Sequence, residues 1–254
     1  MSVIGVVSMK GGVGKTSVTA NLAVALARTL GAGRVSAVDL DPQNALRFHL
    51  GLDFDDHSGV CIQSVEGRSW SEVAKPTEHG VLCLPYGEVT EEQRGEFEDS
   101  LDAHPSSIGD QIEDAGLNTN AIVLIDTPPG PSPYLRQTLA CADLIIVVLL
   151  ADAASYATVS TMESWLAEMQ EQFPRTPHLY LLNQIDRTDL LNKDVADVLH
   201  HRLQDKLIPM GVHLDESVRE ALAFQQPVMA YDPHGQASHD LARLAEYLID
   251  TLNR

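Results

Sequence analysis

The chain has 254 residues, of which 44% are hydrophobic, and this length is enough to bury the core of a single domain spanning residues 1–254. Its 36 acidic residues outnumber 17 lysines and arginines, which gives a net charge of −19. A field of this sign repels nucleic acid and anionic lipid at long range. Composition therefore argues against direct DNA binding, and the longest apolar run, Leu144–Ala151, is too short to span a bilayer.

The N-terminus and the cysteines indicate a cellular compartment. No basic region precedes the apolar run that begins at Val3, which argues against a secretory signal peptide. Cys61, Cys83 and Cys141 are scattered without the spacing of a metal site. We expect reduced thiols in a cytoplasmic protein.

Apolar runs alternate with helical patterns along the chain, which predicts an α/β fold. The expected architecture is a doubly wound, mostly parallel sheet with helices on both faces. Strands are expected at Val3–Val7, Val35–Asp39, Val81–Leu84, Ile122–Asp126, Leu144–Leu149 and Leu179–Asn183, with a further short strand at Leu207–Pro209. Helices are expected at Lys15–Leu30, Glu91–Ala115, Tyr134–Cys141, Ser155–Gln172, Lys193–Lys206, Glu216–Phe224 and Ala237–Leu252. Residues 53–76 mix turn and apolar signals and are expected to form an irregular excursion at one edge.

A glycine-rich loop follows the first strand and opens the first helix. Its sequence is S-M-K-G-G-V-G-K-T-S, residues 8–17. Strand, glycine-rich loop and helix in this order are the context of a phosphate-binding loop. Backbone N–H groups can close around phosphate where glycines leave no Cβ in the way, and the helix N-terminus favours an anion. The residues predicted to bind nucleotide here are Lys10, Gly11, Gly12, Val13, Gly14, Lys15, Thr16 and Ser17.

Two side chains of this loop have separate predicted roles. Lys15 reaches the β- and γ-phosphates, and the Thr16 hydroxyl ligates Mg²⁺. The alternative is a glycine-rich turn that carries two solvated lysines. The spacing of the lysines and glycines, together with the context, favours the phosphate loop.

The loop departs from the general pattern G-x-x-x-x-G-K-[ST], because Met9 occupies the first glycine position and Lys10 precedes Gly11. This K-G-G-x-G-K-[ST] form resembles the deviant Walker A loop of the ParA/MinD family of dimerising ATPases. The resemblance implies a P-loop ATPase fold, ATP or ADP with Mg²⁺ as cofactors, and a homodimer with nucleotide sandwiched between subunits. It also implies that Lys10 touches the phosphates of the partner's nucleotide.

Two carboxylates follow the second strand, in V-D-L-D-P-Q at residues 38–43. Positions i and i+2 of an extended segment project to one side, beside the ligand crevice of an open α/β sheet. An ordinary acidic turn ending at Pro42 explains the same residues. The family resemblance instead implies that Asp41 positions the attacking water and that Asp39 lies nearer the metal's water shell. Partition ATPases continue D-P-Q-G-N, whereas here Asn44 follows Gln43 directly, which puts the local turn in question.

The segment V-L-I-D-T-P-P-G, residues 123–130, resembles a Walker B strand. Asp126 is predicted to hold Mg²⁺ through a water. Gly130 is a candidate donor of a backbone N–H to the γ-phosphate that changes position on hydrolysis. A buried strand followed by a proline-rich turn is the alternative.

The base is predicted to be adenine. Asn183 ends a strand and has the acceptor and donors that an adenine edge requires. The sequence N-Q-I-D at residues 183–186 is similar to the guanine-reading N-K-x-D of GTPases, but Gln184 replaces the lysine. In the family a late loop walls the base, and Pro209 and Val212 are the corresponding candidates here.

The resemblance extends from Val3 to about Val228, and three branches of the family compete. Partition proteins bind DNA through basic surface, and septum-site or flagellar-number proteins end in a basic membrane helix; neither fits the net charge or the apolar final helix. The third branch is the cellulose-synthase-associated BcsQ type, whose L-P-F-G-x-x-x-x-E-Q resembles residues 84–93. It implies regulation of a cellulose or exopolysaccharide secretion system and recruitment to the inner membrane through protein partners. A slowly hydrolysing, ATP-locked scaffold is a further alternative.

Overall fold

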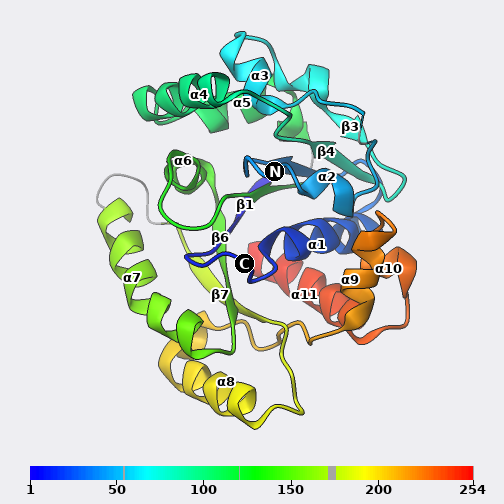
Figure 1. Ribbon diagram of the computed structural model, residues 1–254, viewed down its shortest axis with the longest axis vertical. Helices are drawn as coiled ribbons and strands as arrows, with labels where there is room; N and C mark the ends of the chain where they lie inside the picture. The colour runs from blue at the N-terminus through cyan, green and yellow to red at the C-terminus, as the bar shows by residue number, and fades with distance from the viewer. Residues whose placement is uncertain (54, 120, 171–175, 254) are drawn as a thin grey trace.

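The computed structural model describes residues 1–53, 55–119, 121–170 and 176–253. In these ranges seven strands form one sheet in the order β3-β4-β2-β5-β1-β6-β7 (Figure 1). The strands are β1 (Ser2–Val7), β2 (Val35–Asp39), β3 (Lys75–Pro76), β4 (Val81–Leu84), β5 (Ile122–Asp126), β6 (Leu144–Leu150) and β7 (His178–Asn183). Parallel pairs join β4 through to β7, and β3 adds an antiparallel edge. This confirms the predicted doubly wound, mostly parallel architecture.

Helices cover both faces of the sheet (Figure 1). They are α1 (Lys15–Leu30), α2 (Leu46–His49), α3 (Val60–Val65), α4 (Glu91–Ala103), α5 (Ser107–Asp114), α6 (Pro133–Cys141), α7 (Ala153–Gln170), α8 (Leu190–Leu203), α9 (Glu216–Ala223), α10 (Val228–Tyr231) and α11 (Gln236–Leu252). Short 3₁₀ turns lie at Trp70–Val73, Leu117–Thr119 and Gln204–Lys206. Residues of α1 and α11 pack on one face, and residues of α3 to α8 pack on the other.

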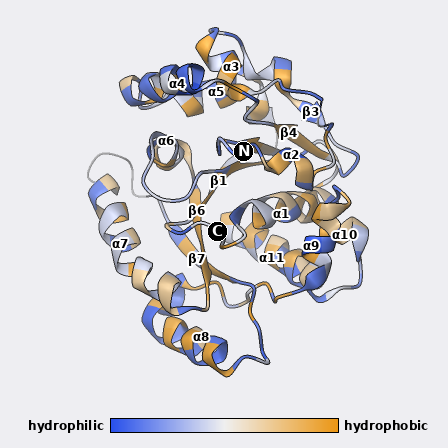
Figure 2. Ribbon diagram, viewed as in Figure 1, coloured by the Kyte–Doolittle hydropathy of each residue, from blue (hydrophilic) through white to orange (hydrophobic). Residues whose placement is uncertain are grey.

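The strands are buried on both faces, so they are apolar along most of their length. In β6 the sequence L-I-I-V-V-L-L is buried except at its last residue, and the central strands are coloured as hydrophobic in Figure 2. The final helix α11 packs against α1 through Leu241, Leu244 and Leu248, each at most 2% exposed. This confirms that α11 docks on the core. No described helix is both long and apolar enough to cross a membrane.

Three local expectations were wrong. The expected helix over 91–115 is two helices, because Pro105 disfavours helical backbone at His104 and interrupts the hydrogen bonding. The expected strand at Leu207–Pro209 is a single bridge from Tyr180 to Leu207, since Pro209 has no N–H to extend a ladder. The excursion at residues 53–76 contains α3, a 3₁₀ turn and β3 in its described part. Of the expected helix at 155–172, residues 171 and 172 lie outside the described ranges.

Candidate functional site

The glycine-rich loop joins β1 to α1, as predicted. Gly12 and Gly14 have φ of 77° and 80°, a region that side chains disfavour. At Gly14 a Cβ would also lie 2.5 Å from the Asn183 amide nitrogen. That amide donates to the Val13 carbonyl oxygen at 2.8 Å, so β7 fixes the loop from the far side. Glycine at position 14 is required both by the backbone and by this close approach.

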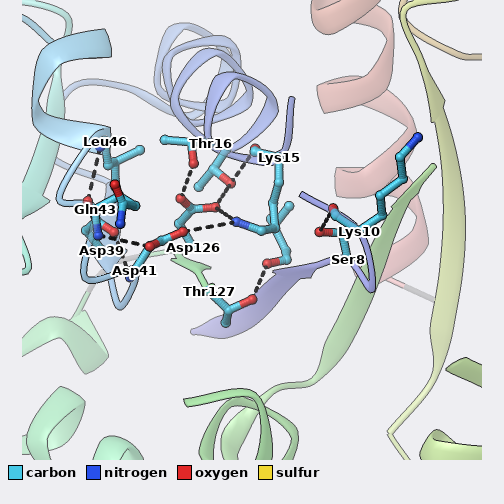
Figure 3. A network of polar contacts seen from close by, with 12 residues as sticks. Ser8, Lys10, Lys15, Thr16, Asp39, Asp41, Gln43, Leu46, Asp126 and Thr127 are labelled. Atoms are coloured by element: carbon cyan, nitrogen blue, oxygen red, sulfur yellow. Dashed lines mark hydrogen bonds and ion pairs between the residues drawn. The ribbon is translucent and has the colours of Figure 1, made fainter. Parts of the chain in front are cut away.

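Asp126 is the centre of the polar network in Figure 3. Its carboxylate is fully buried and accepts hydrogen bonds from Thr16 Oγ1 at 2.6 Å and Thr19 Oγ1 at 3.0 Å. Lys15 Nζ lies 3.3 Å from Asp126 Oδ1 and 3.9 Å from Asp41 Oδ2. The first helix and the ends of β2 and β5 thus bring Lys15, Thr16 and Asp126 together. Thr16 and Asp126 present the oxygen atoms that Mg²⁺ prefers.

The two carboxylates after β2 have different environments. Asp39 is fully buried and accepts the backbone N–H groups of Asp41 at 2.9 Å and Leu46 at 3.1 Å. Burial, followed by repulsion from Asp126, raises the pKa of Asp39 well above its ordinary value. Asp41 faces Lys15 and accepts the Gln43 N–H at 3.0 Å. Asp39 therefore shapes the loop, and Asp41 is the carboxylate that faces the phosphate loop.

The turn after Asp41 lacks the glycine of partition ATPases, and Asn44 takes its place. Its φ is 51°, the left-handed conformation that asparagine adopts more readily than most residues. Its N–H donates to the Asp41 carbonyl oxygen at 2.8 Å, which closes the turn. Asparagine thus supplies the left-handed backbone conformation that a glycine would otherwise provide.

Lys10 does not join the network around Asp126. Figure 3 shows its side chain pointing away from that cluster. Its Nζ lies 2.7 Å from Asp152 Oδ2, at the N-terminus of α7. Partial burial opposes ionisation of Asp152, but hydrogen bonds from Lys10 and the Ser155 N–H outweigh it and lower the pKa of that carboxyl. No pattern in the sequence indicates Asp152 as the partner of Lys10.

Gly130 has a φ of 81° and donates its N–H to the Ser8 carbonyl oxygen at 2.8 Å. Its N–H is therefore engaged with the phosphate loop itself. A contact from this N–H to a phosphate requires that the bond to Ser8 be replaced or shared.

Two cavities meet at Gly14 and Ser17. The first, of about 370 Å³, is lined by residues 10–17 together with Ser8, Asp41, Gln43, His49 and Pro129, and we call it the phosphate cavity. The second, of about 120 Å³, is lined by Gly14, Ser17, Val18, Asn21, Asn183, Gln184, Val212, His213, Leu214, Asp215, Val218, Arg219 and Leu241, and we call it the base cavity. A nucleotide laid across Gly14 would reach both.

The structure separates the two residues predicted to wall the base. Val212 lines the base cavity, but Pro209 lines a different cavity on the far side of His213. His213 and Leu214 line the base cavity beside Val212.

His49 is a site residue that the sequence analysis missed. It belongs to α2, is 5% exposed, and lines the phosphate cavity beside Asp41 and Gln43. Burial lowers its pKa to about 4, so the imidazole is neutral at physiological pH. The four-residue helix that positions it is too short to leave a periodic signal in the sequence.

The segment at residues 84–93 connects this site to the edge of the sheet. A Cβ on Gly59 would lie 2.2 Å from the Gly87 nitrogen, so the two loops meet backbone to backbone. Glu88 accepts a hydrogen bond from Arg47 of α2 at 2.7 Å, and Thr90 with Gln93 forms a capping box on α4. The segment therefore holds α2, which follows the Asp41 turn.

Comparison with known proteins places the chain. The family model described as cellulose biosynthesis protein BcsQ matches residues 1–249. The chain belongs to the BcsQ family. It is 28% identical to the cellulose biosynthesis protein BcsQ of Salmonella typhimurium over 98% of this chain and 94% of that protein. It is also 30% identical to the chromosome-partitioning ATPase Soj of Thermus thermophilus over 96% of this chain and 93% of that one.

A solved structure adds the nucleotide context. The septum site-determining protein MinD from Pyrococcus horikoshii, complexed with Mg-ADP, matches with a TM-score of 0.78 and 25% identity. The match covers 97% of this chain and 95% of that one. The BcsQ family chain described here is thus a member of the ParA/MinD-type ATPases, as its phosphate loop indicated.

Proposed function

We propose that residues 1–254 form one ATPase domain that binds ATP with Mg²⁺, pairs face to face with a second copy, and hydrolyses ATP to ADP and phosphate. The observation that carries this proposal is the placement of Lys10. A lysine that served only its own nucleotide would lie with Lys15 near Asp126. Lys10 instead lies at the outer wall of the phosphate cavity on Asp152, where its side chain is 35% exposed. From there it can reach a nucleotide in a second subunit.

Lys15, Thr16 and Asp126 are the residues proposed to hold the phosphates and Mg²⁺. The Thr16 hydroxyl and the Asp126 carboxylate are 2.6 Å apart and supply hard oxygen ligands, with Asp39 behind them toward the metal's water shell. When bound, Mg²⁺ neutralises charge on the phosphates. The ammonium of Lys15, now shared between two carboxylates, would turn to the phosphate oxygens. Gly11, Gly12, Val13, Gly14 and Ser17 would complete the cradle with backbone N–H groups.

Asp41 is proposed to orient the attacking water. Its side chain faces the phosphate cavity, and the Gln43 N–H fixes one of its oxygens. The other oxygen, Oδ2, lies 3.9 Å from Lys15 Nζ and would be freed when Lys15 turns to the phosphates. Gly130 would then exchange its bond to Ser8 for one to the γ-phosphate, which would link hydrolysis to movement of the loop after β5.

The base cavity is proposed to take adenine. Asn183 uses one amide N–H on the Val13 carbonyl, so its Oδ1 and second N–H remain for a base edge. Val212 offers apolar surface on the opposite wall. Pro209 lines the neighbouring cavity, which shares His213 with the base cavity, and it stays a proposed backbone contact to the base.

Membership of the BcsQ family supports a role in cellulose or exopolysaccharide secretion. The protein would act in the cytoplasm and reach the inner membrane through protein partners of the secretion complex, without inserting itself. Its net charge of −19 supports the further expectation that it does not bind DNA directly.

Three measurements test this proposal. Phosphate release by the purified protein, alone and with cellulose synthase components, separates a cycling switch from an ATP-locked scaffold, which would turn over in neither case. A pull-down with those components tests the secretion branch. Co-sedimentation with DNA or anionic liposomes at physiological salt should be absent; ATP-dependent binding to DNA would favour a partition ATPase, and binding to liposomes a septum-site type.

A further inference from the structure

A third cavity, of about 510 Å³, lies beyond the base cavity. It is bounded by the end of β7, by α8 at the bottom of Figure 1, by residues 208–213 and by α11. Its apolar wall includes Leu182 and Ile208, and its volume is that of a small-molecule site. It shares His213 with the base cavity and no lining residue with the phosphate cavity. We call it the α8 cavity.

Three cations line the α8 cavity without partners. Within the described ranges, Arg187, Lys193 and Arg243 make no ion pair and no side-chain hydrogen bond with another residue. Most other described cations are engaged, as Lys10 and Arg47 are by carboxylates. All three are exposed, and three aspartates, Asp186, Asp197 and Asp240, line the same cavity, so its lining is balanced in charge within a chain that has twice as many acids as bases.

Two of the three carboxylates in the same cavity are occupied by donors other than these cations. Asp240 already accepts the backbone N–H of His213 at 3.0 Å, its ring nitrogen at 2.7 Å and the Gln236 amide at 2.8 Å. Asp186 accepts the N–H and hydroxyl of Thr188 at 2.8 and 2.6 Å. Asp197, on the exposed side of α8, is the remaining acid. The cations therefore have capacity for an external anion.

We propose that the α8 cavity binds a small anion that carries at least two phosphate or carboxylate groups, separately from the nucleotide. Charge-assisted hydrogen bonds from guanidinium groups favour such groups because two N–H donors match two oxygens. His213 lines both the α8 cavity and the base cavity, so an anion here adjoins the wall of the nucleotide site. The proposal does not depend on hydrolysis or on a cellulose partner.

Inorganic pyrophosphate is the probe that tests the site. Calorimetric titration would use the full chain saturated with ADP, in magnesium-free buffer, so that the phosphate loop is occupied. We expect saturable binding with a dissociation constant below about 1 mM. Arg187→Ala and Arg243→Ala should each weaken it about fivefold or more. Arg34→Ala is the matched control, because Arg34 is exposed, makes no ion pair in the described part, and precedes β2, an inner strand that is separated from β7 by three other strands.

Lys15→Ala without ADP provides a second background, in which the phosphate loop is impaired and the α8 cavity is intact. Pyrophosphate binding that survives this change and is weakened about fivefold or more by Arg187→Ala or Arg243→Ala supports the site. Absence of binding at 10 mM, on the order of ten times the expected constant, would overturn it. So would an equal loss with Arg34→Ala, or a loss caused by Lys15→Ala alone.

Discussion

Two lysines of one loop, Lys10 and Lys15, occupy opposite environments. The Lys15 side chain is 6% exposed and lies between the carboxylates of Asp126 and Asp41. The Lys10 side chain is 35% exposed and pairs with one carboxylate, Asp152, on the far side of the loop. A buried charge requires compensation, whereas an exposed ion pair contributes little and exchanges readily. Lys15 is thus built into its own site, and Lys10 is available for another.

The carboxylates that face these two lysines also differ in what holds them. The turn after β2 is held by backbone hydrogen bonds to Asp39 and Asp41, and it places a carboxylate within reach of Lys15. Asp152 instead serves α7, whose first turn it caps through the Ser155 N–H. The inner acid, Asp41, therefore faces the phosphate cavity, and the outer acid, Asp152, holds Lys10 away from it.

The largest expected effect is on turnover, at Asp41. Asp41→Ala should lower the rate of ATP hydrolysis about 10²- to 10⁴-fold, because a positioned carboxylate that orients water is lost. ATP affinity should change little, since Asp41 does not grip phosphate. Phosphate release under saturating ATP measures the rate, with the exposed Asp205→Ala as the control. Reduced affinity with an unaltered rate would assign Asp41 to binding.

The second-largest effect is on ATP affinity, which should differ between variants of the two lysines. Lys15→Ala should weaken ATP binding about 100-fold, because it removes a charge-assisted contact to the phosphates. Lys10→Ala should change binding by a single subunit less than about twofold, since Lys10 faces away. Calorimetric titration with ATP, at protein concentrations too low for the protein to dimerise, measures both affinities. Similar losses in the two variants would break the distinction between an inner and an outer lysine.

The third prediction concerns pH and His49, which lies on the inner side. Its pKa is lowered to about 4, so the unfolded chain binds this proton more readily than the folded one. Stability from His49 is therefore complete above pH 6.5 and is lost as pH falls toward 4. When the pH is lowered from 7.5 to 5, the free energy of unfolding of the native chain should fall by about 2 kcal/mol more than that of the His49→Gln variant. Denaturant unfolding at both pH values tests this; identical losses would place His49 in contact with solvent.

The smallest expected effect is at the outer pair. Asp152→Asn keeps an acceptor for the Ser155 N–H but removes the charge that holds Lys10. Exposed ion pairs contribute about 0.2–1 kcal/mol, so ATP-dependent pairing should tighten about two- to fivefold. Sedimentation velocity across a concentration series measures it. Weaker pairing in this variant would show that Asp152 belongs to the interface itself.

The fold was predictable because its signals are local. The central strands are continuous apolar runs. Each run stops abruptly at a polar residue, so Asp126 and Asn183 could be placed at the carboxyl ends of their strands. The loop from Lys10 to Thr16 was recognisable because its backbone conformation requires glycines at fixed positions, and those glycines are visible in the sequence. These features need no knowledge of distant contacts.

The remainder depends on contacts between distant segments. Asp152 meets Lys10 from 142 residues away, and no pattern near either residue indicates the other. His49 enters the phosphate cavity through a helix of four residues, which has no periodicity to detect. His213 reaches the base cavity just after Gly211, where a Cβ would lie 2.6 Å from the Leu182 carbonyl oxygen, and no local pattern marked this histidine.

We propose that Lys10 acts on the nucleotide of a second subunit, and the mass of the ATP-bound protein in solution tests this proposal. Light scattering would compare Asp41→Ala with Lys10→Ala/Asp41→Ala, both saturated with Mg-ATP, since slow hydrolysis keeps the nucleotide in place. We predict that the first has about twice the monomer mass of 27.6 kDa and that the second keeps the monomer mass while retaining ATP. A double variant that pairs as readily as Asp41→Ala would contradict the account.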